Sequence, residues 1–310
     1  MQTQQRKIVT RLTNSGNPTN VQKVAIMWIR DGVLIERMHI NAVAFAYAAQ
    51  LSSNPATANK TNLWELIDYA FEKSGLSCAE KIALYNTNRQ NVRYGEDCTV
   101  KLYNSIATEA AKEAGYFDGT IELLRDLKGG GSANFITSAL EQELLDSWFA
   151  GPQGQQIAGS LETVLGKRGD FTKGRQHFQY VSELGYERIY YVADAVFEIS
   201  TSARFAHEFK IVPIGFGNKI SKDTVFEAVQ IVSAAVRRIR QELKLSHLSD
   251  SKIDSLITNL DSLKDKLVDP QTDPKLLADA GAKVVVEGAR DALMQDLRQY
   301  FESQDLLLVD

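Results

Sequence analysis

The chain has 310 residues, of which 44% are hydrophobic and 24% are charged. These are ordinary values for a globular protein, so they exclude collagen-like and wholly disordered chains. The 35 Lys and Arg residues nearly balance the 39 Asp and Glu residues, and the net charge is −4. This balance gives no electrostatic reason to expect nucleic acid or an anionic membrane as a partner.

The sequence also gives no sign of secretion or of membrane insertion. No segment approaches the roughly 18 uninterrupted apolar residues of a membrane-spanning helix, and the N-terminal residues lack the apolar core of a signal peptide. Cys78 and Cys98 are the two cysteines, and neither has the spacing of a zinc site or of a disulfide framework. We therefore expect a cytoplasmic protein without a membrane span.

Residues 1–20 are polar and predict a loosely ordered lead-in. The apolar run from Val24 to Ile29 stops at Arg30-Asp31-Gly32, which is typical of a strand buried on both faces and closed by a charged turn. Over residues 39–115, apolar residues recur at spacings of three and four, which predicts an all-helical insertion after this strand.

Residues 116–220 alternate between helical segments and short apolar strands near residues 133–137, 188–192 and 210–215. Strands separated by helices predict a Rossmann-like parallel sheet with helices on both faces, formed by residues 21–38 and 116–220. Residues 221–310 predict a C-terminal helical extension, whose last helix runs from Leu276 to Phe301 and is interrupted by Gly281 and Gly288. The amphipathic faces of this extension need a partner, either the main domain or another copy of the chain.

Ligands of parallel sheets bind at the carboxyl ends of the strands. Polar groups that could hold a phosphate and a magnesium ion follow the predicted strands, and a lysine begins a later helix: Asp31, Thr137, Ser138, Lys173, Asp194 and Glu198. A hydroxyl and an ammonium group bind phosphoryl oxygens, and carboxylates bind the hard cation.

Three segments in this order resemble the haloacid dehalogenase (HAD) superfamily of phosphohydrolases, over about residues 20–220. They are Asp31-Gly32-Val33-Leu34, the stretch from Phe117 to Leu124, and the stretch from Val192 to Glu198. The resemblance is to the subgroup with a helical cap inserted after the first strand. It implies a catalytic α/β core, the cap over residues 39–115 and magnesium-dependent chemistry.

The first family motif is a hydrophobic run followed by Asp-x-Asp-Gly, in which the first Asp is the nucleophile and the second is the general acid/base. This chain has Ile29 at the nucleophile position and Asp31 at the acid/base position. Isoleucine cannot attack phosphorus, and one magnesium ligand is lost with the carboxylate. A shifted register, with Asp31 as nucleophile, places Val33 at the acid/base position and leaves Gly32 unmatched.

The resemblance assigns the remaining positions as follows. Thr137 or its neighbour Ser138 matches the phosphate-binding hydroxyl, Lys173 or Lys167 matches the phosphate-binding lysine, and Asp194 and Glu198 match the metal-binding acids. Each also has a plainer interpretation. Thr137 is typical of a helix N-cap, Lys173 of a solvated side chain, and Asp194 with Glu198 of capping charges. Arg30 is either a surface charge or the partner of Asp31 or Asp194 in place of the missing metal.

Three functions follow from these residues. The favoured one is a non-catalytic, pseudophosphatase-like regulator or assembly component that binds a small phosphorylated ligand or a protein partner. The second is a magnesium-dependent phosphohydrolase that uses Asp31 as general acid/base without a covalent intermediate. The third is a structural protein whose C-terminal helices mediate self-association. The first is preferred because a missing nucleophile is a chemical loss.

Overall fold

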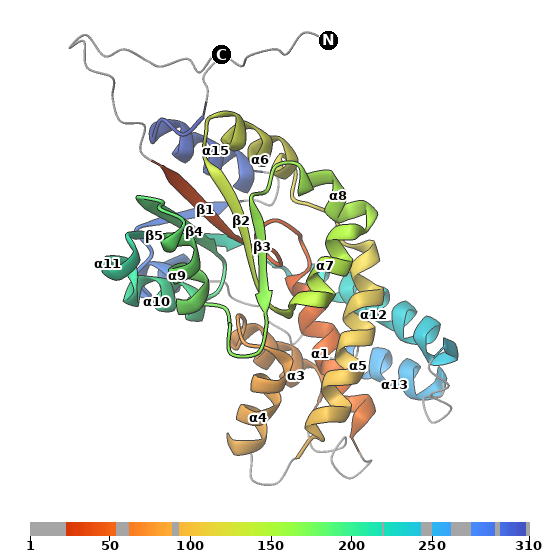
Figure 1. Cartoon of the computed structure of the whole chain (residues 1–310). Coiled ribbons are helices and arrows are strands. Elements are labelled where there is room, and N and C mark those ends of the chain that lie inside the picture. Colours follow the sequence, from red (N-terminus) through yellow and green to blue (C-terminus); the bar gives the residue numbers. More distant parts are fainter. Residues whose placement is uncertain are drawn as a thin grey trace, which may run out of the picture.

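The computed structural model, shown in Figure 1, describes residues 23–53, 62–88, 93–218, 220–242, 250–261, 274–288 and 292–307. A six-stranded sheet with every neighbouring pair parallel forms its centre, in the order β3-β2-β1-β4-β5-β6. The strands are β1 (Val24–Ile29), β2 (Ala133–Glu141), β3 (Thr163–Lys167), β4 (Arg188–Ala193), β5 (Ile211–Asn218) and β6 (Val284–Gly288).

Strand β1 lies in the middle of the sheet, between β2 and β4. All six of its residues are buried, as the uninterrupted apolar run predicts for a strand that is covered on both faces. The chain continues from β1 to β2 on one side and later returns to β4 on the other. This reversal creates a crevice at the carboxyl ends of β1 and β4, where ligands of such sheets bind.

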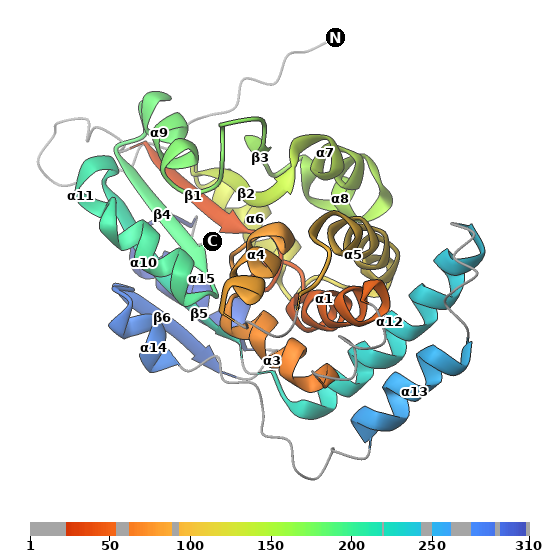
Figure 2. The same ribbon diagram turned by 90° about the horizontal axis from the view of Figure 1, so that it is seen from below.

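Helices surround the sheet and form the cap. They are α1 (Met38–Ser52), α3 (Leu63–Glu72), α4 (Cys78–Asn88), α5 (Glu96–Ala110), η1 (Ala111–Glu113), α6 (Thr120–Gly129), α7 (Gln142–Ala150), α8 (Pro152–Ala158), α9 (Arg175–Glu183), α10 (Val196–Arg204), α11 (Ala206–Phe209), α12 (Lys222–Glu242), α13 (Asp250–Asp261), α14 (Pro274–Asp279) and α15 (Leu293–Ser303). Helices α6 and α15 pack together on one face, whereas α9, α10, α11 and α14 cover the other (Figure 2). The predicted α/β class with an inserted helical cap is confirmed.

Helices α1, α3, α4 and α5 lie beyond the carboxyl ends of the strands, and α12 packs along α1 and α5 (Figure 2). The hydroxyls of Tyr47 on α1 and Ser233 on α12 are hydrogen-bonded at 2.8 Å. Arg238 on α12 forms an ion pair with Glu109 on α5 at 2.7 Å. The first helix of the C-terminal extension therefore buries its apolar face against the cap of its own chain.

The expected last helix from Leu276 to Phe301, interrupted by Gly281 and Gly288, is wrong over its middle part. Strand β6 interrupts it and pairs in parallel with β5. The run Val284-Val285-Val286 favours a strand because β-branched residues pack well on a pleated surface. Gly281, at a φ of +104°, lies in the left-handed region just after α14 and ends that helix. The extension is thus part of the sheet.

Helix α15 completes the core behind β1 and β4. The ring of Phe301 lies edge-on to Trp28 of β1 and to Tyr190 of β4, with centroid distances of 5.9 and 5.8 Å. The predicted self-association rested on amphipathic faces without an internal partner. For α12 and α15 those faces are covered inside the chain, so self-association stays a prediction without that support.

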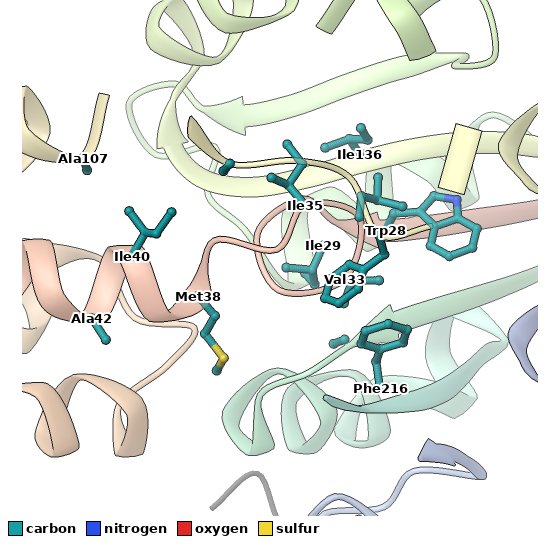
Figure 3. Packing of buried hydrophobic residues seen from close by; sticks show 14 of the residues in the cluster. Trp28, Ile29, Val33, Ile35, Met38, Ile40, Ala42, Ala107, Ile136 and Phe216 are labelled. Atoms are coloured by element: carbon teal, nitrogen blue, oxygen red, sulfur yellow. The ribbon is translucent and has the colours of Figure 1, made fainter. Parts of the chain in front are cut away.

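One continuous cluster of buried hydrophobic residues joins the sheet to the cap. Figure 3 shows this cluster running from Trp28 and Phe216 in the sheet, through Ile35, to Met38 and Ile40 at the start of α1. The residues that follow β1 are therefore held rigidly between two packed layers. The predicted lead-in, residues 1–20, lies outside the described residues. Within the described part, no helix is long and apolar enough to cross a membrane.

Candidate functional site

A cavity of 210 Å³ lies between the carboxyl ends of the strands and the cap. Every site residue predicted from the sequence lines it: Ile29, Asp31, Thr137, Ser138, Lys167, Lys173, Asp194 and Glu198. The cap contributes Lys81 from α4 and Asn41 from α1. The fold thus brings these side chains together from separate segments of the chain.

The turn after β1 places Asp31 at this cavity. The amides of Leu34 and Ile35 donate to the carbonyl of Arg30, and the amide of Gly32 donates to that of Ile35. Gly32 has a φ of +91°, and a Cβ atom there would collide with the carboxylate of Asp194. Glycine is therefore required twice, for the left-handed backbone and for the close approach of Asp194.

Asp31 is held by cations and amides on several sides. The Arg30 guanidinium donates from Nε to Oδ1 at 2.7 Å and from Nη2 to Oδ2 at 3.0 Å. Asn41 donates to Oδ2 at 3.1 Å, and Arg37 lies 3.6 Å from Oδ1. Burial raises the pKa of Asp31, but the charges of Arg30 and Arg37 outweigh it and hold this pKa well below its usual range. Arg30 is thus a buried partner of Asp31, one of the two partners considered for it.

Lys173 and Glu198 form a second buried pair, between the loop before α9 and helix α10. Asp194 lies beside them, after β4, and is 5% exposed. Asp194 Oδ2 and Glu198 Oε2 are buried and accept no hydrogen bond from the described residues. Burial, together with the neighbouring Glu198, raises the pKa of Asp194 to about 8.

The predicted magnesium site would have to be built from these carboxylates. Within the described residues, no group of three or more His, Cys, Asp or Glu side chains has the arrangement of a metal site. Asp194 and Glu198 leave two orphaned oxygens, but Glu198 is already neutralised by Lys173 and the third position is Ile29. Magnesium prefers a nearly complete shell of oxygen ligands in octahedral geometry. The residues present do not fit it.

Thr137 lies within β2, because the strand continues to Glu141 instead of ending at residue 137. The extended pairing of Glu141 with Lys167 of β3 outweighs the local capping signal, so Thr137 is not a helix N-cap. Its hydroxyl is 2.7 Å from Nδ1 of His177. Nε2 of His177 faces the Gly166 carbonyl at 3.3 Å and must donate to it, so Nδ1 accepts the Thr137 proton.

This pair changes what Thr137 offers to a ligand. Its one hydroxyl proton is committed to His177, so it presents only lone pairs to the cavity. The Ser138 hydroxyl accepts from the amide of Leu140 at 3.2 Å and keeps its own proton free for an anion. His177 is fully buried, and burial lowers its pKa to about 4, so it is neutral near pH 7.

Of the two candidate lysines, Lys173 is the better placed. Its side chain is 13% exposed, whereas Lys167 is 44% exposed and pairs with Glu141 at 3.0 Å. Lys81 is a residue that sequence reasoning missed. Burial lowers the pKa of Lys81 to about 8 against the opposing effect of Glu198 and Asp194. No sequence signal could identify it, because its position depends on how the cap lies over the sheet.

The comparisons with known proteins place this fold. No known family profile and no curated protein matches the sequence. Among solved structures, the chain is similar to a hydrolase from Pseudomonas syringae, with 14% identity, a TM-score of 0.53, and 91% of this chain and 98% of that chain covered. It is also similar to a HAD family hydrolase from Deinococcus radiodurans R1, whose structure has bound phosphate and sodium. That match has 16% identity, a TM-score of 0.52, and 92% and 98% coverage.

These likenesses establish the fold. The chain has the α/β architecture of HAD-type hydrolases, in agreement with the resemblance that the sequence motifs indicate. At these identities they carry no information about the reaction, so function has to be argued from the residues of the cavity.

Proposed function

We propose that this chain is a HAD-like protein without aspartyl-phosphate chemistry, which binds a small anionic ligand between sheet and cap. The observation that carries the proposal is the pair of positions after β1. Ile29 occupies the place of the nucleophile, and Asp31, at the acid/base place, is bonded through both oxygens to Arg30. Neither position supplies the group that phosphoryl transfer through an aspartyl-phosphate needs.

Phosphohydrolysis without a covalent intermediate is the competing function. It requires Asp31 to accept a proton from water, but Arg30 and Arg37 hold its pKa well below the range useful for a general base near pH 7. Both carboxylate oxygens also already accept hydrogen bonds. Water activation would first require this network to open, so the geometry favours binding over turnover.

The ligand of this proposal is a small phosphorylated or otherwise anionic molecule. Ser138 offers a hydroxyl proton and Lys81 supplies positive charge at the same cavity, which Lys173, paired with Glu198, also lines. At 210 Å³, the cavity is below the range of about 300–1,000 Å³ that drug-sized ligands occupy, so the bound group is compact. In the proposal, occupancy of this site makes the chain a regulator or assembly component that acts on a protein partner.

The experiment is hydrolysis of a broad phosphoester panel with magnesium by the wild type, Asp31→Asn and Ile29→Asp. We expect the wild type to be inactive, and restored turnover in Ile29→Asp would identify a lapsed phosphatase. Wild-type activity that is abolished by Asp31→Asn would overturn the proposal in favour of the phosphohydrolase. Binding of inorganic phosphate to the wild type, measured by calorimetry and weakened in Ser138→Ala, tests the ligand class separately.

A further inference from the structure

A second, larger cavity of 530 Å³ lies beside the first. Cap helix α5 and core helices α7 and α8 form its walls, which are mainly apolar and include Ala107, Ala111, Leu144 and Trp148. Its volume lies within the range of about 300–1,000 Å³ that small-molecule sites occupy.

The charged groups of this cavity are unbalanced. Its lining contains three cations, Arg30, Arg37 and Lys112, against the single carboxylate of Asp31. Lys112 is paired elsewhere, because it donates to Glu109 at 2.5 Å. The positive excess therefore falls on the two arginines.

Arg30 and Arg37 are 2% and 5% exposed, so this excess charge is buried. Arg30 donates hydrogen bonds from Nε and Nη2 to Asp31. Arg37 uses its Nε and Nη2 on Asn41 and on the carbonyl of Ala107. Nη1 of each guanidinium makes no hydrogen bond with the part of the chain that the structure describes. Two buried guanidiniums that share one carboxylate favour a second anion, because buried charges are stable only when they are paired.

Arg30 also lies against the apolar wall of this cavity. Its guanidinium lies 5.2 Å from the centroid of the Trp148 ring. A planar ring can lie along the apolar wall while an attached carboxylate reaches the guanidinium donors, which match carboxylates by geometry. We propose that this second cavity binds a small apolar carboxylate, with an aromatic or aliphatic body against Trp148 and the anionic group at Arg30 and Arg37.

This site is separate from the one in the proposed function. The two cavities are adjacent, and both are lined by Arg30, Asp31, Tyr103, Asn104, Leu140 and Leu144, whereas Lys173, Asp194 and Glu198 line only the first. Trp148, Arg37 and Thr108 line only the second. Loss of phosphate binding in the first cavity therefore leaves the inference about the second one intact, and the reverse also holds.

The test uses the full chain with 2-naphthoate as the probe and 2-naphthamide as its uncharged counterpart, both measured by titration calorimetry. We expect saturable binding of one naphthoate per chain, with the amide weaker by about tenfold or more. Equal affinities for the acid and the amide would overturn the proposed role of the arginines. Absence of saturable naphthoate binding, as when another part of the chain fills the cavity, would overturn the site itself.

Variants locate the bound probe. Thr108 is exposed at the cavity and lines only this one, so Thr108→Trp narrows it without disturbing the core. Thr108→Trp should weaken naphthoate binding by about tenfold or more. Arg37→Met should weaken it to a similar extent, once circular dichroism has shown that this variant is folded. The matched control is Lys167→Ala, which changes only the first cavity and should leave the affinity unchanged. Unchanged affinity in Thr108→Trp, or an equal loss in Lys167→Ala, would overturn the assignment.

Discussion

The guanidinium of Arg30 donates two hydrogen bonds, of 2.7 and 3.0 Å, to the two carboxylate oxygens of its neighbour Asp31. The two residues directly follow the central strand β1. They therefore lie at the crevice beside the carboxyl ends of the strands, where parallel sheets bind their ligands. A cation in the chain thus neutralises the acid/base position, and Lys173 does the same for Glu198. Two of the carboxylates of the site are thus paired with cations of the chain, whereas Asp194 Oδ2 has no partner among the described residues.

Arg30→Gln should raise the pKa of Asp31 toward its ordinary value and lower the free energy of unfolding by about 1–3 kcal/mol, because a half-buried carboxylate loses its closest cation. Urea unfolding at pH 7 measures the loss. The double variant Arg30→Gln/Asp31→Asn should recover part of it. The control is Arg175→Gln, since the Arg175–Glu208 pair is 56% and 44% exposed and should contribute less than about 1 kcal/mol. Equal losses in Arg30→Gln and Arg175→Gln would contradict the importance of the buried pair.

Magnesium should leave the melting temperature of the wild type unchanged, since Ile29 supplies no ligand and Glu198 is already paired with Lys173. Ile29→Asp places a carboxylate at a position that is 5% exposed, beside the cavity that Asp194 also lines. This variant should melt lower than the wild type and should regain stability with about 10 mM magnesium, because a divalent cation relieves carboxylate repulsion. Thermal melts with and without the metal measure both effects.

Ile29→Asn is the matched control for that experiment. It is polar but uncharged, so it should be destabilised without a response to magnesium. The melting temperature of the wild type could instead rise with magnesium as much as that of Ile29→Asp. That result would show that the native residues do hold the metal and would contradict the conclusion that they do not fit it.

The central strand and the polar residues at the strand ends could be predicted, because they depend on local apolar runs and on the fact that parallel strands share one carboxyl edge. Asp31 and Asp194 therefore lie just after β1 and β4, at the cavity along this edge. The hydrogen bond between Thr137 and His177 could not be predicted, because it joins residues 40 positions apart on different elements. Strand β6 was missed because its helical flanks conceal a five-residue segment that only pairing with β5 stabilises.

The stability should fall as the pH decreases below about 6.5, through His177. Burial lowers its pKa to about 4 in the folded chain, against 6.5 when unfolded, so between these values only the unfolded state binds the proton. The loss from pH 7.5 to pH 5 should be about 2 kcal/mol, should reach about 3 kcal/mol near pH 4 and should level off below that pH. The control is His177→Gln, which keeps a donor and an acceptor but does not titrate.

At each pH, the free energy of unfolding of His177→Gln is subtracted from that of the wild type, which removes the contributions of all carboxylates. One of these is Asp194, whose raised pKa makes the folded state more stable as the pH falls, opposite to His177. A difference between the two proteins that does not change with pH would show that His177 titrates normally, and therefore that its contact with Thr137 is not buried.

Gly32→Ala should destabilise the chain more than Gly131→Ala. Both glycines have a φ near +90°, at +91° and +92°, so the backbone strain is matched. Nothing lies within 4 Å of the Cβ position at Gly131, whereas at Gly32 that position meets the Asp194 carboxylate. The extra cost should be about 1–3 kcal/mol in urea unfolding, the usual range for overpacking. Equal costs would mean that Asp194 does not lie against this turn.

Phe301→Ala should cost about 3–5 kcal/mol, because Phe301 of α15 is fully buried between Trp28 and Tyr190. The matched control is Phe197→Ala on α10, where the ring is 51% exposed and the cost should be below about 1 kcal/mol. Urea unfolding of the full chain compares the two. Small and equal costs would mean that α15 does not pack firmly on the sheet and that the C-terminal segment is a separable appendage. A large cost confined to Phe301→Ala would mean that the packing of α15 stabilises the central sheet, although α15 lies more than 250 positions after β1 in the sequence.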